Sequence, residues 1–330
     1  MRVTVLGAGS WGTTMASLVA GRHPTIVWAR DPDVADGIRT NSHNPRYLSE
    51  FELPSTLDAT DDLQKAVGQA ELLIVGVPSH AFRETLVAAK PHVHPWIPIV
   101  SLTKGLEQGT LLRMTQIIRE VLPGHPAAAL TGPNIAREIM EGNAAASVVA
   151  TEDLDVAGAI QCELQRGLLR IYTNHDVIGC ELGGVFKNVV AIACGIAQGL
   201  KVGDNTRAAV MTRGLAELTR LGVAMGGEPA TFAGLAGMGD LVATCISPYS
   251  RNRYVGEQLG MGRSLEDVLG GMSMVAEGVK AAVTVRELAA RHDIDMPVCA
   301  SIHDVVTGAI PASDAYRGLQ RQAGHEAEPG

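Results

Sequence analysis

The sequence predicts an α/β domain built on a parallel sheet, followed by an all-α domain. The chain has 330 residues, more than the ~250–300 at which a single hydrophobic core tends to divide. Short β-rich runs alternate with amphipathic stretches up to about residue 172, as in a parallel sheet with helices on both faces. Strand-type runs then stop. We therefore expect one domain over residues 1–175 and a second over residues 176–330.

The expected strands are short runs rich in aliphatic and β-branched residues. They cover residues 2–7, 25–30, 72–77, 96–102, 127–132, 146–150 and 168–172. Amphipathic stretches between several of these runs predict helices over residues 79–90, 107–121 and 154–166. In the second half, helical periodicity with Gly or Pro punctuation predicts helices over residues 176–200, 204–222, 251–260, 264–271, 275–291 and 297–309.

The composition is that of an ordinary folded protein, with 46% hydrophobic and 19% charged residues. The formal net charge is −8, and no basic stretch stands out. This argues against binding to nucleic acid or to a membrane surface. An anionic ligand would have to be met by a few placed cations.

Cysteine usage and the apolar runs bear on the compartment. The five cysteines form no CxxC pair and lie at positions 162, 180, 194, 245 and 299. We expect reduced thiols in a cytoplasmic protein. The amino terminus lacks the long apolar core of a signal peptide. Lys187 interrupts the best candidate for a membrane helix, so we expect no membrane span.

A glycine motif follows the first expected strand and opens a helix. Gly7, Gly9 and Gly12 have the spacing GxGxxG. The first glycine permits a tight turn, the second lets backbone amides approach a pyrophosphate, and the third allows close packing of helix on strand. In this context the motif indicates a Rossmann domain that binds NAD or NADP. The alternative is a glycine-rich turn that binds nothing.

The second strand leads into Arg30 and Asp31. A carboxylate after this strand holds the adenosine ribose of NAD, whereas an arginine there suits the 2′-phosphate of NADP. Arg30 favours NADP, and Asp31 leaves NAD open. Arg30 could also be a solvated surface residue.

Two further loops follow strands at the carboxyl edge of the expected sheet, where such folds bind ligands. Lys104 ends the sequence SLTK, and the sequence TGPN contains Gly132, Pro133 and Asn134. The glycine permits close approach, the proline can start a helix and the asparagine offers an amide. Each loop alone is equally compatible with simple turn chemistry.

The segment 234–252 carries the signal for a phosphate site. Ser250 can cap a helix that starts Arg251, Asn252, Arg253. Basic residues are unfavourable in a first helical turn, and an arriving phosphate would reverse that penalty. The alternative is a capping serine with two solvated arginines.

Lys187 lies within the apolar stretch 181–200, and Asp240 lies in a segment of small and aliphatic residues. On a helix, the lysine would share its face mostly with small residues, which would let another element come close. Opposite Asp240 it could be held charged and could exchange a proton with a substrate. A lysine that is only ion-paired, or that extends to solvent, is the common alternative.

Other polar and sulfur-containing residues give weaker evidence for a functional site. His92 and His94 lack a third ligand at metal spacing, so no metal site is expected. Met272 and Met274 read as core or loop filling. Glu277, which follows them, is kept as a candidate site residue.

Taken together, these motifs resemble bacterial NAD(P)-dependent glycerol-3-phosphate dehydrogenase, in order and spacing, over about residues 2 to 310. The matching stretches are GAGSWGTT, SLTKG, TGPN, ELGGVFKNVVAIACGIAQGL and GLAGMGDLVATCISPYSRN. The last of them is highly specific.

The resemblance implies reversible reduction of dihydroxyacetone phosphate to sn-glycerol 3-phosphate, the backbone precursor of phospholipids. It also implies a helical domain of the 6-phosphogluconate-dehydrogenase type, with the active site in the cleft between the domains. By motif, Lys187 corresponds to the proton acceptor in oxidation and the donor in reduction, Asp240 to its partner, and Lys104 to a contact with substrate and cofactor. The other implied substrate contacts are Gly132, Asn134, Ser250, Arg251 and Asn252. The other implied cofactor contacts are Ser10, Trp11, Arg30, Ala136, Arg251 and Glu277.

Two other hypotheses for the function of this protein stay open. A β-hydroxyacid dehydrogenase of the same two-domain type would also use a helix lysine, with less need for the Ser-Arg-Asn helix start. A non-catalytic dinucleotide sensor would bind the cofactor without turnover. A homodimer is the commonest expectation for a protein that self-associates.

Overall fold

The computed structural model describes residues 1–272 and 276–315. Two compact units divide after Glu181. The boundary expected from the sequence lies six residues earlier, after position 175, and stays a prediction. The end of the chain beyond residue 315 and Met274 lie outside the described residues.

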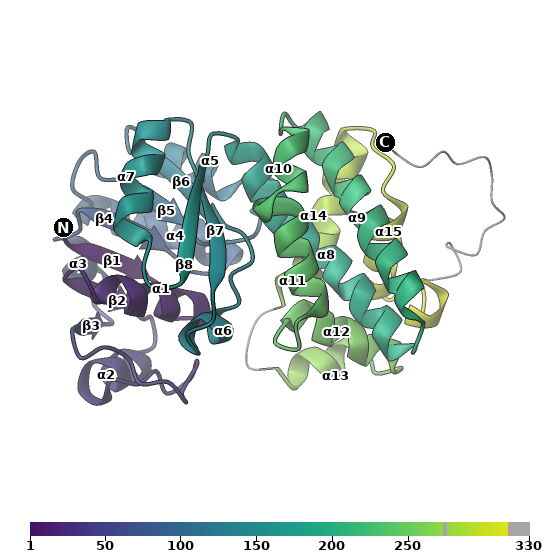
Figure 1. Ribbon diagram of the computed structural model, residues 1–330, viewed down its shortest axis with the longest axis horizontal. Helices are drawn as coiled ribbons and strands as arrows, with labels where there is room; N and C mark the ends of the chain where they lie inside the picture. Colours follow the sequence, from purple (N-terminus) through teal and green to yellow (C-terminus); the bar gives the residue numbers. More distant parts are fainter. Residues whose placement is uncertain (273–275, 316–330) are drawn as a thin grey trace. The chain divides into compact units, whose positions relative to one another are not determined.

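The first unit is one eight-stranded sheet with helices (Figure 1). Its strands are β1 (Val3–Leu6), β2 (Thr25–Trp28), β3 (Leu57–Thr60), β4 (Leu72–Val75), β5 (Ile99–Ser101), β6 (Ala127–Thr131), β7 (Ala145–Ala150) and β8 (Leu169–Asn174). Its helices are α1 (Ser10–Ala20), α2 (Pro32–Asn41), α3 (Leu63–Val67), α4 (Ser79–Ala89), α5 (Met114–Val121), α6 (Ala136–Met140) and α7 (Leu154–Leu164).

The strand order is β3-β2-β1-β4-β5-β6-β7-β8, and all neighbours from β3 to β6 are parallel. The fold class expected from the sequence is therefore confirmed. The sheet is not parallel throughout, because β7 runs antiparallel to β6. The connection between these two strands holds only α6, whose five residues are too few to cross the sheet face as a parallel connection requires.

Strand β3 and the helices α2, α3 and α6 were not among the elements expected from the sequence, and one expected helix begins later than predicted. Strand β3 was not predicted, because Leu57–Thr60 is a four-residue edge strand with the sequence LDAT, which carries little β signal. The helix expected over residues 107–121 begins only at Met114. A short bridged loop comes first, in which Leu106 pairs with Arg113 and Leu111 adopts a φ of +60°.

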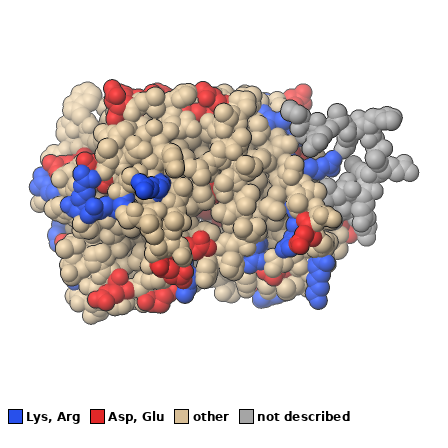
Figure 2. Space-filling view, in the orientation of Figure 1, with Lys and Arg blue, Asp and Glu red and all other residues tan. Residues whose placement is uncertain are grey.

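Charged side chains on the face in Figure 2 form small groups, and acidic residues lie between and beside the basic ones. No continuous basic surface covers this face. On this face, an anion would therefore be attracted by single cations rather than by an extended basic patch.

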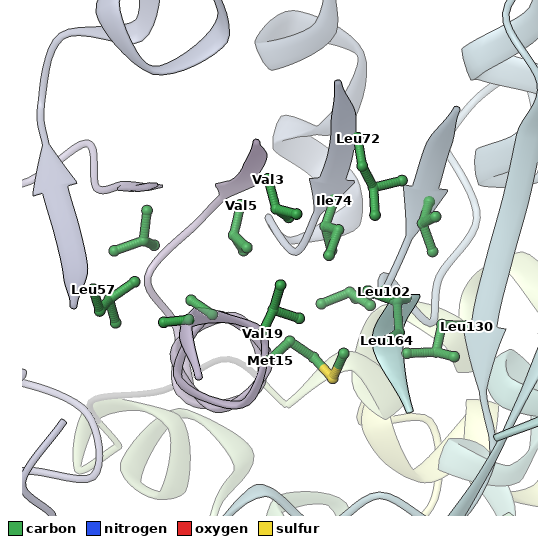
Figure 3. Close-up of a cluster of buried hydrophobic side chains, with 14 of the residues drawn as sticks. Val3, Val5, Met15, Val19, Leu57, Leu72, Ile74, Leu102, Leu130 and Leu164 are labelled. Atoms are coloured by element: carbon green, nitrogen blue, oxygen red, sulfur yellow. The ribbon is translucent and has the colours of Figure 1, made fainter. Parts of the chain in front are cut away.

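The core of the first unit lies on both faces of the sheet. One cluster packs α1 against β1 and β4, with Met15 and Val19 facing Val5 and Ile74 (Figure 3). A second cluster packs α4 and α5 against the other face around Phe82. The sheet edge that carries the loops after the strands is thus held on a rigid base.

The second unit is helical in its described residues (Figure 1). Its helices are α8 (Val177–Gly199, which begins in the first unit), α9 (Asp204–Ala224), α10 (Pro229–Ala233), a π-helical turn (Leu235–Gly239), α11 (Asp240–Ile246), α12 (Arg251–Gly260), α13 (Leu265–Gly270), α14 (Glu277–Arg291) and α15 (Pro297–Val306). The sequence did not predict α10, the π turn or α11, because glycines and short length hide their periodicity.

Helix α8 is the central helix of this unit. Among the described residues it is the one helix long and apolar enough to cross a membrane, with a mean hydropathy of 1.6 over an 18-residue window. That window is 94% buried inside the protein, as is typical of the core helix of a folded domain. Glycines let α12 approach it closely: a Cβ added at Gly195 would lie 2.0 Å from the Arg253 carbonyl oxygen.

Candidate active site

The glycine turn after β1 has the geometry of a pyrophosphate cradle. Gly7 has a φ of +108°, and an added Cβ would lie 2.9 Å from the backbone of Gly76. An added Cβ at Gly12 would lie 1.9 Å from the Gly7 carbonyl oxygen, so only glycine permits this packing. Gly9, the N-cap of α1, has nothing within 4 Å of its added Cβ and makes no side-chain cap. The start of α1 is therefore open to an anion.

Two unpartnered polar groups of the first unit fit a dinucleotide. The indole Nε1 of Trp11 and the amide Nδ2 of Asn134 are buried donors without a hydrogen-bond partner among the described residues. A buried donor without an acceptor costs roughly 1–3 kcal/mol. A bound ligand that offers oxygens would remove that cost. The residues of the first unit therefore fit the nicotinamide cofactor that the glycine motif predicts.

The loops after β5 and β6 meet, as the sheet-edge argument expects. Lys104 Nζ donates to the Gly132 carbonyl oxygen at 2.9 Å and to Asn134 Oδ1 at 2.6 Å. Gly132 has a φ of +115°, which a residue with a side chain rarely adopts. Lys104 occupies the oxygen of Asn134, and the amide nitrogen remains as a buried donor without a partner among the described residues. Ala136 opens α6 two residues later.

Lys187 forms a buried polar group with Asp240 and Thr244. Only 5% of Lys187 and 2% of Asp240 are exposed. Lys187 Nζ donates to Asp240 Oδ1 at 2.7 Å and to Thr244 Oγ1 at 2.6 Å. The Thr244 hydroxyl in turn donates to the Asp240 main-chain oxygen at 2.7 Å. Two of the three ammonium protons are thus used, and one remains for a substrate oxygen.

The small-residue face of α8 makes this pairing possible. An added Cβ at Gly183 would lie 2.5 Å from the Ala236 carbonyl oxygen in the π turn. This close approach brings the end of the π turn, and with it Asp240, to Lys187. Single π turns inside helices are rare and occur often at functional sites. The sequence predicted the close approach but not the π turn that uses it.

The thiol of Cys245, near the pair, is held neutral. Cys194 on α8 and Cys245 on α11 are buried. A hydrogen bond with Cys194, followed by burial, raises the pKa of the Cys245 thiol well above its usual value, and the charge of Asp240 adds to this. The Cys245 thiol therefore adds no charge to the cluster.

The helix start at residues 250–252 is confirmed as a capped N-terminus. Ser250 Oγ accepts the Arg253 amide at 3.2 Å, and the first turn of α12 holds no acid. Arg251 is exposed. Arg253 instead is buried and donates to the Ser247 carbonyl oxygen at 2.9 Å and to Gln198 Oε1 at 2.7 Å. The alternative of two solvated arginines is therefore wrong for Arg253.

Asn252 joins three helices. Its Oδ1 accepts the Gly278 amide at 2.9 Å, and its Nδ2 donates to Asn188 Oδ1 at 2.8 Å. Asn188 Nδ2 donates to the Gly184 carbonyl oxygen at 3.2 Å. Glu277 is the first residue of α14, directly before Gly278. The site expectations missed Thr244 and Asn188. Their signals were polar side chains one helical turn after Asp240 and one residue after Lys187.

The remaining expected contacts lie in the first unit. Ser10 and Trp11 open α1. Arg30 is exposed and lies two residues beyond β2. Among the described residues, no cluster of three or more His, Cys, Asp or Glu side chains is arranged to hold a metal.

The fold and these polar groups define the class of this protein: it is a dinucleotide-dependent oxidoreductase with a Rossmann sheet and a helical unit that carries a buried lysine. Two family models identify its family. The amino-terminal model for NAD-dependent glycerol-3-phosphate dehydrogenase matches residues 2–157, and the carboxy-terminal model matches residues 176–317. The chain belongs to the NAD-dependent glycerol-3-phosphate dehydrogenase family.

Individual relatives support the same family assignment. Glycerol-3-phosphate dehydrogenase [NAD(P)+] 2 of Sphingopyxis alaskensis is 55% identical, over 100% of this chain and 99% of its own. A glycerol-3-phosphate dehydrogenase [NAD(P)+] 1 from Mycobacterium tuberculosis is 50% identical, over 98% of this chain and 96% of its own. The crystal structure of glycerol-3-phosphate dehydrogenase from Coxiella burnetii has a TM-score of 0.93 at 35% identity and covers 97% of this chain and 99% of its own. These relatives favour this family over a hydroxyacid dehydrogenase or a sensor.

Proposed function

We propose that this chain catalyses the reversible reduction of dihydroxyacetone phosphate to sn-glycerol 3-phosphate with NADH or NADPH, and so supplies the backbone of glycerophospholipids. Family membership supports the reaction. The observation that carries the chemistry is the buried group of Lys187, Asp240 and Thr244, with Lys187 Nζ 2.7 Å from Asp240 Oδ1.

Lys187 is assigned to the proton transfer. A nicotinamide held by the first unit would supply the hydride for the carbonyl carbon. As that carbon is reduced, its oxygen develops alkoxide character, which an adjacent ammonium stabilises. Lys187 donates one proton from Nζ to this oxygen, and in the reverse direction it takes the proton from the hydroxyl. A placed acid or base typically contributes ~10²–10⁴ in rate.

Asp240 and Thr244 hold the lysine for this step. Asp240 provides the counter-charge that a buried ammonium requires. Thr244 Oγ1 accepts a second hydrogen bond from Lys187 Nζ at 2.6 Å. With two of its N–H groups fixed, the third points in a defined direction. Defined direction is what turns a charged side chain into an effective proton donor.

The start of α12 is assigned to the substrate phosphate. Ser250 caps the helix, no acid lies in its first turn, and Arg251 is exposed at its first position. A phosphate there gains from helix amides and from a charge-assisted bond to arginine. Asn252 can offer its second amide hydrogen. Binding the non-reacting end of the substrate in this way orients the carbonyl.

The cofactor is assigned to residues of the first unit together with Arg251 and Glu277 of the second, and some of these residues are also assigned to the substrate. Gly7, Gly9 and Gly12 form the pyrophosphate cradle. The other cofactor contacts proposed are Ser10, Trp11, Arg30, Lys104, Ala136, Arg251 and Glu277. Lys104, Gly132 and Asn134 are also assigned to the substrate, since their mutual contacts leave the Asn134 amide nitrogen as a donor.

We further propose a cytoplasmic homodimer, with residues 1–175 as the dinucleotide domain and residues 176–330 as the substrate domain. Five free cysteines, of which four are buried, favour a reducing compartment. Met238, Val242 and Ile246 form an exposed apolar row along the π turn and α11, the kind of surface that a second copy can cover. Analytical ultracentrifugation measures the dimer directly.

The reaction is tested by oxidation of NADH and of NADPH with dihydroxyacetone phosphate as acceptor. Wild type should turn over, and Lys187→Met should lose at least ~10² in kcat while still binding the dinucleotide. Lys90→Met, an exposed lysine after α4, is the matched control and should behave as wild type. Near-normal turnover of Lys187→Met would remove this lysine from the chemistry. Reduction of a keto acid in place of the triose phosphate would redirect the assignment.

A further inference from the structure

We propose that Arg46, from the segment after α2, is a second cation for the 2′-phosphate of NADP(H), so that this chain binds NADP(H) more tightly than NAD(H). The inference rests on the proposed function, which requires a nicotinamide dinucleotide but leaves the choice between the two open. The choice is made at the loop after β2, where the adenosine ribose of a dinucleotide lies in this fold.

Asp31, the one acid directly after Arg30, is already engaged by the protein. Its Oδ1 accepts the Asp33 amide at 3.1 Å and so caps α2. Its Oδ2 accepts Arg46 Nη1 at 3.2 Å. A carboxylate that selects NAD must instead accept the ribose hydroxyls. Asp31 therefore serves to start a helix and to hold an arginine, rather than to hold the ribose.

Arg46 is positioned by a buried asparagine that also contacts the glycine turn. Asn44 is fully buried, and its Oδ1 accepts the amides of Arg46 at 3.0 Å and Tyr47 at 2.9 Å. Its Nδ2 donates to the Ala8 carbonyl oxygen and to Thr13 Oγ1, both at 2.9 Å. Ala8 lies between Gly7 and Gly9. The segment that carries Arg46 is thus tied to the loop that receives the pyrophosphate.

Charge and chemistry favour a phosphate over a hydroxyl at this point. Arg46 pairs with Asp31, and Arg30 precedes Asp31 in the chain, so these three residues carry two guanidinium groups and one carboxylate. The Arg46 side chain is 53% exposed, which keeps it within reach of a ligand. A guanidinium matches the geometry of a phosphate and can bind it with two hydrogen bonds. A neutral ribose hydroxyl gains little binding energy from two guanidinium groups.

The competing explanation is a plain surface ion pair between Arg46 and Asp31. Exposed pairs contribute little to stability, so an ion pair alone gives no reason for a fully buried asparagine to fix the backbone of Arg46. The two explanations differ in one measurable respect. If Arg46 contacts the 2′-phosphate, its loss weakens the binding of NADPH but not of NADH. If it forms only an ion pair, its loss does not distinguish the two dinucleotides.

The experiment measures binding without turnover, by isothermal titration calorimetry on the full chain. The ligands are NADPH, NADH, adenosine 2′,5′-bisphosphate and adenosine 5′-monophosphate. Wild type should bind each 2′-phosphorylated ligand more tightly than its partner. Arg46→Gln should weaken binding of the 2′-phosphorylated ligands about tenfold and leave the other two unchanged. Arg39→Gln is the matched control, because Arg39 is similarly exposed at 45% and is also paired with an aspartate, Asp36.

Three outcomes overturn the inference. Arg46→Gln could weaken both dinucleotides equally, which would make Arg46 a structural residue. Arg39→Gln could reproduce the loss, which would make the effect one of general charge. Wild type could bind NADH as tightly as NADPH. Failure of wild type to bind either dinucleotide is a separate result, because it contradicts the proposed function rather than the role of Arg46.

Discussion

Lys187 Nζ and Asp240 Oδ1 lie 2.7 Å apart, although the two residues are 53 positions apart in the chain. Both are almost fully buried, so each provides the charge that the other needs away from water. The pair depends on a glycine of α8 and on the π turn that packs against it.

Replacing Asp240 should damage both stability and turnover. Asp240→Asn leaves the Lys187 ammonium buried without a counter-charge, and breaking a buried pair in this way costs about 3–5 kcal/mol. We expect a loss of that size in the free energy of unfolding by urea, followed by far-ultraviolet circular dichroism, and a lower kcat. Glu152→Gln removes an exposed acid paired with Arg119 and should change stability by less than about 1 kcal/mol. Equal effects of the two variants would contradict the role given to burial.

Gly183 should not tolerate alanine. The added methyl group would lie 2.5 Å from the Ala236 carbonyl oxygen, so the π turn must move and carry Asp240 away from Lys187. We expect Gly183→Ala to lower both the melting temperature and kcat. The control is Gly158→Ala in α7, where nothing lies within 4 Å of the added Cβ. There, alanine should stabilise the helix by roughly 0.5–1 kcal/mol. A neutral Gly183→Ala would show that the close approach is not required.

Glu217 should make stability depend on pH. It is buried, and its carboxylate accepts the amides of Val298 at 2.7 Å and Cys299 at 3.0 Å. Burial is the largest influence and raises the pKa of Glu217 above its ordinary 4.5, although these hydrogen bonds oppose it. A raised folded-state pKa means that this contribution to stability is complete below the unfolded pKa and is lost as the pH rises through the folded value.

The Glu217→Gln variant tests that sign. The unfolding free energy of wild type minus that of the variant should fall as the pH rises from about 4.5 upward. Urea unfolding at a series of pH values gives this difference, in which the other titrating groups largely cancel. A difference that increases with pH would reverse the assignment.

Thiol reactivity should single out one cysteine. Cys162 is exposed, whereas the other four cysteines are buried. Burial is the main cause that raises the pKa of Cys180 and of Cys299, and it contributes to the raised pKa of Cys245. The thiolate is the reactive form. A disulfide reagent should therefore titrate one thiol quickly in the native protein and all five in denaturant. Loss of the fast phase in Cys162→Ser is the confirming control.

Much of the fold could be predicted because hydrophobic periodicity reports it locally. The amphipathic helix α4 and the buried strands β1 and β4 each carry their pattern within a few residues. β3 could not be predicted, since a polar edge strand of four residues is held by its neighbours rather than by its own sequence. The antiparallel direction of β7 also lacks a local signal, because strand direction is set by what the connection can span.

In the candidate site, too, some features could be predicted from the sequence and others could not. The glycine turn could be predicted from three glycines alone, because the backbone conformation that they permit is a local property. Thr244 as a partner of Lys187 could not, since the contact depends on the π turn. The role of Arg253 was also hidden: only the packing of α12 against α8 shows that this arginine is buried and holds Ser247 and Gln198.

The sequence by itself determined the order of the two domains, the dinucleotide turn and the residue types that exchange protons and bind phosphate, because each of these depends on spacing within a short stretch. The tertiary structure alone decided which charges meet. Asp240 faces Lys187, and Asp31 faces Arg46 rather than standing ready for a ribose. Electrostatic partnership depends on distances between segments remote in the chain, and those distances are fixed only when the backbones pack.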